Sequence, residues 1–365
     1  MTNDELLSKT ISFLRFPLIV GVVFIHNKMC EINIQGEFIS YDTWPWVNNV
    51  MYFFSSVLPA ISVPLFFLIS GFLFFYNVDF EKRIYIKKLK SRFKTLVIPY
   101  LIWNFVGFLI LLVQMHPRFL SLFPLLKDYR IDIYEFFSYF WIRDLPMDPP
   151  GEHSTPINFP FWFIRDLIVL VILSPLIYFF IKRLKLMFII ALGCVYLWGL
   201  GKYVGLPLMC HQSLFFFPLG AFFSINHINF VKLAHKAKWS PYTYILIAVA
   251  DIFTMGEPCN YWLHYGTIFI GLIASLYIGS VFVESGNLSI SKFLSDASFF
   301  IFAIHGLFIS KYMKALVMLL NPHSPCAVLL IYFFVPITTI IFSLFIYKGI
   351  CKYCPVVARV ITGSR

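Results

Sequence analysis

The sequence predicts an all-α, polytopic integral membrane protein with about ten transmembrane helices and both termini in the cytoplasm. Two observations carry this prediction. The composition is strongly apolar: of 365 residues, 59% are hydrophobic, 20% are aromatic and only 13% are charged, and the mean hydropathy is +0.80. The apolar residues also gather in runs long enough to cross a bilayer as helices. We therefore expect a single membrane domain over residues 1–365.

Ten apolar segments of spanning length can be placed along the chain. They cover residues 11–29, 53–76, 95–114, 160–181, 186–204, 207–224, 241–256, 262–283, 296–318 and 327–350. Glycines and a proline interrupt the region 186–224, so it also allows a different division. The first run is interpreted as a spanning helix rather than a cleaved signal peptide, because Arg15 lies inside it and no small-residue cleavage site follows it.

The net charge of +11 lies mostly in short loops that alternate onto one side of the membrane. Basic residues occupy 82–94, 182–185, 232–238 and the C-terminal tail. This is the positive-inside pattern, so we expect cytoplasmic termini and a lipid bilayer, rather than nucleic acid, as the partner of this chain. On the opposite side, the longer connections 30–52 and 115–159 are candidates for a lid or a binding surface, with an ordered cap without chemistry as the alternative.

Cysteine and histidine spacing does not indicate a metal site. No two of the nine histidines lie three or four residues apart, and the single CxxC pair near the C-terminus has no partners. Disulfides could form near the predicted outer face, although unpaired packing cysteines are the plainer interpretation. The cysteines concerned are Cys30, Cys210, Cys259 and Cys326. We expect neither a metal nor a permanently bound cofactor.

The first apolar segment carries an arginine and a histidine on one face of its helix. Ten residues separate Arg15 from His26. Eleven helical steps of about 100° return the second side chain to within roughly 20° of the first, about 17 Å further along the axis. Ionisable residues inside membrane helices usually face the protein interior or a wet cavity. The spacing therefore predicts a polar path, with Arg15 in its cytoplasmic third and His26 in its outer half.

Other polar residues can reach the level of His26. Arg165 and Asp166 lie about 8–9 Å below the outer end of the fourth segment, and His305 lies near the middle of the ninth. A neutral imidazole with a carboxylate partner can take a proton from a hydroxyl. Asp166 is therefore the first candidate partner of His26, and Asp251 is the second. Purely structural roles remain open for all five, including a local Arg165–Asp166 ion pair.

Five sequence features follow one another over most of the chain. They are the Arg15–His26 pair and the segments 63–73 (VPLFFLISGFL), 90–100 (KSRFKTLVIPY), 161–167 (FWFIRDL) and 298–306 (SFFIFAIHG). As an ordered set they resemble the bacterial acyltransferase 3 family of membrane acyltransferases. Members of that family are ten-helix inner-membrane proteins that move an acyl group, commonly acetyl, from cytoplasmic acyl-CoA to a hydroxyl of an envelope glycan or lipid-linked sugar.

The resemblance implies an O-acetyltransferase of the bacterial cell membrane. Acyl-CoA, acetyl-CoA first, would be the donor substrate, and a carbohydrate or glycolipid would be the acceptor. His26 would be the catalytic histidine and Arg15 its partner on the coenzyme side. Arg92 and Lys94 would meet the donor phosphates first, since cationic side chains match phosphate. Many members that acetylate O-antigens carry two arginines three apart at this place, where the present chain reads Arg92-Phe93-Lys94.

The remaining assignments complete the expected site. Asp166 is assigned to catalysis beside His26, and we expect Arg165, His305 and Trp162 to bind the substrate. A competing hypothesis is a transporter or exporter of a glycan or small acid, in which the intramembrane polar residues form a substrate or proton path. That path would consist of Arg15, Asp166, Asp251 and His305.

Overall fold

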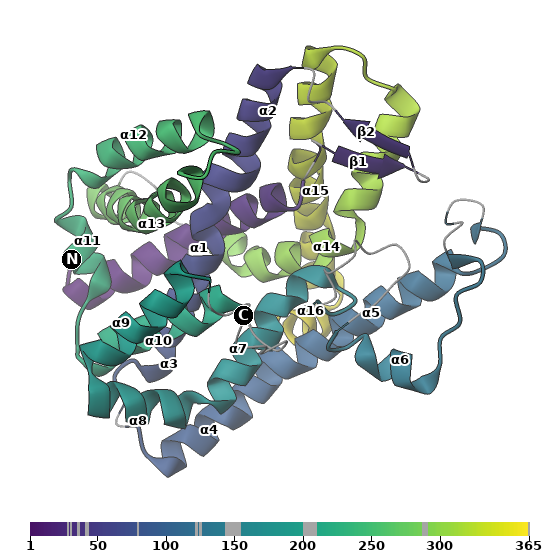
Figure 1. The fold of residues 1–365 in the computed structure, drawn as a ribbon. Coiled ribbons are helices and arrows are strands. Elements are labelled where there is room, and N and C mark those ends of the chain that lie inside the picture. The colour runs from purple at the N-terminus through teal and green to yellow at the C-terminus, as the bar shows by residue number, and fades with distance from the viewer. Residues whose placement is uncertain are drawn as a thin grey trace.

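The computed structural model describes most of the chain. The described residues are 1–27, 29, 31–34, 37–40, 44–78, 80–120, 123, 126–142, 155–199, 210–286 and 291–363. They form helices and one antiparallel hairpin of two short strands, β1 (Glu31–Ile34) and β2 (Glu37–Ser40) (Figure 1). The predicted helical class is thus confirmed, with this hairpin as an addition that the sequence analysis did not foresee.

The helices follow one another along the whole chain. In order they are α1 (Asn3–Ile25), α2 (Pro45–Tyr52), α3 (Ser62–Phe75), α4 (Lys82–Arg92), α5 (Ile98–Gln114), α6 (Ile133–Ser138), α7 (Trp162–Ile172), α8 (Ser174–Leu184), α9 (Leu186–Leu197), α10 (His211–Ile225), α11 (Phe230–His235), α12 (Ser240–Phe253), α13 (Asn260–Ser285), α14 (Lys292–Leu320), α15 (Pro325–Tyr353) and α16 (Pro355–Thr362). A π-helical turn (Phe53–Val57) and a 3₁₀ turn (Leu58–Ile61) join α2 to α3. A second π-helical turn (Phe93–Val97) joins α4 to α5.

Each predicted segment contains a helix, but within the described residues fewer than ten reach spanning length. Six stretches are long and apolar enough to cross a membrane, and a seventh arises if α7 and α8, which meet at a bend of 63°, count as one span. The six are Asn3–Ile25, Pro45–Phe75, Lys82–Gln114, Asn260–Ser285, Lys292–Leu320 and Pro325–Tyr353. The shortfall lies in the fifth, sixth and seventh predicted segments, which form the shorter α9, α10 and α12. The protein is multi-pass, while ten spans and cytoplasmic termini stay predictions.

Helix α1 crosses the middle of the molecule and contacts α3, α13, α14 and α15 (Figure 1). It begins with a capping box: Glu5 N–H donates to Thr2 Oγ1 (3.2 Å), and Thr2 N–H donates to Glu5 Oε2 (2.9 Å). Apolar side chains on several sides of the helix are buried, among them Leu7, Leu14 and Val22. Its polar face is thereby directed into the protein rather than into lipid.

Helices α3 and α10 approach each other until their backbones touch. A Cβ placed on Gly71 would lie 2.0 Å from Phe217 O, and one on Gly220 would lie 1.9 Å from Leu68 O. Small residues at such contacts let membrane helices pack at short distance. This contact fixes α10 against α3 along one wall of the site described below.

We expect Gly71→Ala and Gly220→Ala to destabilise the protein by about 1–3 kcal/mol or more, because either methyl group would force the two backbones apart. Gly349→Ala is the matched control, since a Cβ there meets nothing within 4 Å. Thermal unfolding of the three variants in one detergent measures the difference. Equal stability of all three would contradict the close contact.

Candidate active site

A cavity of about 520 Å³ lies between α1, α3, α7, α10, α13 and α14. Four of the predicted site residues line it: Arg15, His26, Arg92 and Trp162. The structure thus has a hollow along the face of α1 that carries Arg15 and His26. Arg15 and His26, which share one face of the helix, both reach its surface.

Arg15 and Arg92 lie at the same end of this cavity. Helices α1 and α3 run antiparallel, because Gly21 of α1 packs against Ser62 of α3 while Asp4 Oδ1 accepts a hydrogen bond from Tyr76 Oη (3.0 Å). Arg15, which precedes Gly21 on α1, therefore lies toward the C-terminal end of α3. Lys88 of α4 donates to the carbonyl oxygen of Phe74 near that end of α3, and Arg92 follows Lys88 by one helical turn, so both arginines border the same end of the cavity. We call this the basic end.

His26 lies at the opposite end, which we call the histidine end. It lies eleven positions after Arg15 on α1, or about 17 Å further along the axis at 1.5 Å per residue. The wall between the two ends is mainly apolar and includes Ile19, Val22 and Phe66. The cavity is therefore a passage with a polar group at each end and a hydrocarbon-lined middle.

His26 packs against another histidine and a phenylalanine. Its ring centroid is 5.4 Å from that of His305 and 4.6 Å from that of Phe159, which meets it edge-on. His305 is fully buried, and its Nδ1 donates to Ile301 O (3.1 Å). Its Nε2 has no hydrogen-bond partner among the described residues. The structure thus brings His305 to His26, as its level in the ninth segment predicted, but places it behind the cavity wall.

A short polar network holds the segment before α7 against α14. Asn158 Nδ2 donates to Ala303 O (2.9 Å), and Asn158 N–H donates to Asn104 Oδ1 (3.1 Å). Gly306 permits the close approach, since a Cβ there would lie 2.4 Å from Pro160 Cδ. These contacts position Phe159, and through it the ring of His26.

Asp166 does not form the expected pair with His26. Its Oδ1 accepts from Arg165 Nη2 (3.1 Å), and its Oδ2 accepts from Cys210 N–H (2.8 Å) and Ser213 Oγ (2.9 Å). Both Arg165 and Asp166 are buried, and neither is among the residues that line the cavity. The pair instead ties α7 to the first turn of α10. The physical reason is local: a buried ion pair needs further hydrogen bonds, and the start of α10 supplies them.

Lys94 also departs from the expected arrangement. It is exposed in the π-helical turn Phe93–Val97 and is not part of the cavity lining, whereas the half-buried Arg92 is. In a regular helix, residues two apart point to different faces, which separates these two cations. Of the predicted donor-binding residues, the structure therefore brings together Arg15 and Arg92.

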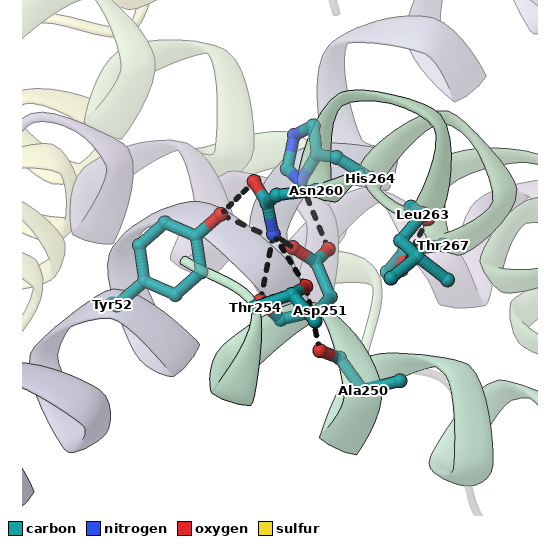
Figure 2. Close-up of polar contacts among 8 residues, drawn as sticks. All are labelled: Tyr52, Ala250, Asp251, Thr254, Asn260, Leu263, His264 and Thr267. Atoms are coloured by element: carbon teal, nitrogen blue, oxygen red, sulfur yellow. Dashed lines mark hydrogen bonds and ion pairs between the residues drawn. The ribbon is translucent and has the colours of Figure 1, made fainter. Parts of the chain in front are cut away.

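Sequence analysis missed a further cavity residue, His264. Its Nδ1 donates to Oδ2 of the buried Asp251 (2.9 Å), and Tyr52 and Asn260 engage the other carboxylate oxygen (Figure 2). The sequence predicted for Asp251 a partnership with His26, a place in a transport path or a structural role, but not a pair with His264. The sequence does carry a signal for this pair, because Asp251 lies near the end of one apolar segment and His264 near the start of the next, with a short connection between them.

Within the part of the chain that the structure describes, the cysteines near the predicted outer face form no disulfide. Cys210, Cys259 and Cys326 are free thiols, and Cys30 lies outside the described residues. Among the described residues no group of three or more metal-binding side chains occurs. Residues 143–154 of the second long loop also lie outside the described part.

We expect Asp166→Asn to act mainly on stability. Removing the charge leaves the buried Arg165 without its counter-ion, and breaking a buried pair costs about 3–5 kcal/mol. The measurement is thermal unfolding in detergent, together with activity per folded molecule. A fully stable but inactive Asp166→Asn protein would instead restore Asp166 to a place beside the reacting groups.

Similarity to known proteins identifies the family of this chain. The acyltransferase domain family matches residues 9–348. A relative, the succinoglycan biosynthesis protein ExoH of Rhizobium meliloti (strain 1021), is 27% identical over 372 residues, which cover 99% of this chain and 94% of the relative. No solved structure matches the chain. Since the family match spans most of the sequence, as the resemblance implied, this chain belongs to the acyltransferase domain family, the acyltransferase 3 family of membrane acyltransferases.

Proposed function

We propose that this protein is an O-acyltransferase of the bacterial inner membrane. It transfers an acyl group, acetyl in the first instance, from cytoplasmic acyl-CoA to a hydroxyl of an envelope polysaccharide or lipid-linked sugar. The observation that carries the proposal is the single cavity with Arg15 and Arg92 at one end and His26 at the other. A polysaccharide acceptor is supported by the relative, whose name places it in succinoglycan biosynthesis.

The basic end suits the phosphorylated part of the donor. Arginine presents several donors in a planar fork that matches phosphate oxygens, and two arginines at one mouth would hold the nucleotide there. The apolar middle would then receive the thinner pantetheine arm, which carries the thioester toward His26. If the termini are cytoplasmic, this end faces the compartment in which acyl-CoA is made.

The histidine end suits the transfer itself. In its neutral form His26 takes the proton of the acceptor hydroxyl while the hydroxyl oxygen bonds to the thioester carbonyl carbon. The carbon–sulfur bond then breaks, and the departing CoA thiolate receives the proton that His26 accepted. Phe159 and His305 pack against the imidazole and keep its orientation. Asp166 contributes by fixing α7 and α10 around the cavity rather than by touching the substrate.

The direct test is acetyl transfer by purified protein in liposomes, with labelled acetyl-CoA and an oligosaccharide made by removing the acyl groups from succinoglycan. His26→Ala should lower both CoA release and labelling of the oligosaccharide by about 10²–10⁴-fold, the usual effect of losing a general base. The control is His323→Ala, an exposed histidine remote from α1 in the sequence. Folded wild-type protein that releases no CoA would favour the transporter hypothesis.

The donor site has a separate prediction. Arg15→Ala and Arg92→Ala should each raise the KM for acyl-CoA about tenfold or more, since each removes a charge-assisted hydrogen bond to phosphate. Lys94→Ala should have a smaller effect because Lys94 lies outside the cavity lining, and the exposed Lys238→Ala serves as control. Steady-state kinetics at varied acyl-CoA measures this. A KM that changes only for the acceptor would argue against phosphate binding at this end.

A further inference from the structure

A second histidine on the cavity surface is held by a buried carboxylate. His264 lines the cavity, and its Nδ1 lies 2.9 Å from Oδ2 of Asp251, whose side chain is 0% exposed. Tyr52 Oη (3.1 Å) and Asn260 Nδ2 (2.8 Å) donate to Oδ1 of the same carboxylate. Helices α2, α12 and α13 thus meet at Asp251, and His264 is the member of the cluster that reaches the cavity.

The carboxylate fixes which nitrogen of His264 carries the proton. A carboxylate oxygen accepts, so Nδ1 is the N–H donor and Nε2 of the neutral ring carries a free lone pair. Figure 2 shows Nε2 on the far side of the ring from Asp251. None of the described residues forms a hydrogen bond or ion pair with Nε2. The ring therefore offers an oriented acceptor atom at the cavity surface.

His264 lies at the histidine end of the cavity. Helices α1 and α13 are antiparallel neighbours: a Cβ on Gly279 would lie 3.1 Å from Leu14 Cδ2 near the basic end. Nearer the other end, the 3₁₀ turn Leu58–Ile61 touches both helices, at Gly21 of α1 and at Gly271 of α13. These two glycines therefore mark a common level.

His26 and His264 lie at nearly equal distances from the level that Gly21 and Gly271 define. His26 is five residues beyond Gly21, or about 8 Å, and His264 is seven residues beyond Gly271 in the same direction, or about 10 Å. The two imidazoles thus stand at similar depth on different helices that border one cavity. A molecule that presents a hydroxyl to His26 would also pass His264.

A purely structural histidine looks different in this protein. His235 also pairs with a carboxylate, yet both of its ring nitrogens are engaged: Nδ1 with Ser280 Oγ (2.8 Å) and Nε2 with Glu284 Oε2 (3.2 Å). It is not part of the cavity lining. A tie between α12 and α13 is already made by Asn260 and Asp251, so it does not require an imidazole with one nitrogen open to the cavity.

We propose that His264 binds the acceptor by accepting a hydrogen bond, through Nε2, from a hydroxyl other than the one that reacts at His26. Asp251 is then a positioning residue that sets the tautomer and orientation of the ring. The acceptor is accordingly a molecule with at least two neighbouring hydroxyls, a sugar or polyol, rather than a simple alcohol. This inference rests on the proposed transferase function and names the group that selects its acceptor class.

The experiment uses the full-length protein in liposomes, with labelled acetyl-CoA and the deacylated succinoglycan oligosaccharide as probes. His264→Ala should raise the KM for the oligosaccharide about tenfold and leave the KM for acetyl-CoA unchanged. His264→Gln should recover part of the loss, because its amide oxygen can accept a hydrogen bond near the position of Nε2. Asp251→Asn should show a weaker form of the same acceptor defect. Thermal unfolding in detergent confirms that each variant is folded.

His235→Ala is the matched control and should keep wild-type kinetics, since it removes a histidine–carboxylate pair outside the cavity. The inference is overturned if folded His264→Ala keeps the wild-type KM for the oligosaccharide, or if both KM values change together. It is also overturned if His264→Ala and His264→Gln lose kcat equally at unchanged KM, which would indicate proton transfer instead of binding. A wild-type protein that releases no CoA would defeat the transferase function itself, which distinguishes the two failures.

Discussion

The cost of placing ionisable groups in a membrane governs this structure. Arg15 and His26 lie on one face of α1, and neither can face lipid without a large loss of solvation. The surrounding helices resolve the conflict by leaving a cavity along that face. The helices around the cavity are closely packed. The closest approach is the backbone contact between α3 and α10, where glycines leave room that a side chain would fill. The cavity accommodates the face of α1 that carries Arg15 and His26.

Buried polar groups around the cavity fall into two kinds. Asp166 and Asp251 each accept several hydrogen bonds and tie helices together, which is how buried polar atoms are normally satisfied. The imidazoles of His26 and His264 differ, because each reaches the cavity surface. The two carboxylates hold the helices in place around the cavity, and the two histidines lie on its surface. This division is the basis for treating the carboxylates as positioning residues.

The two-ended cavity also fits what the family does. A reaction between a phosphorylated donor and a hydroxylated acceptor needs two different recognition chemistries within reach of one transfer point. Cationic side chains at one end and imidazoles at the other meet this need. The apolar passage between them excludes charged groups, so it would admit the acyl-bearing arm and hold back the nucleotide. This arrangement supports the proposed transfer from a phosphorylated donor to a hydroxylated acceptor.

The sequence by itself determined the helical membrane class, the family, and the shared face of Arg15 and His26. The membrane class and the shared face follow from composition and helical period, which act over a few neighbouring residues, and the family follows from the ordered set of motifs that resemble it. Only the tertiary structure decided which side chains meet: Asp166 with the start of α10, Lys94 outside the cavity, and Asp251 with His264. Such partners lie on different helices or across a loop, and helix packing, which no local pattern encodes, brings them together.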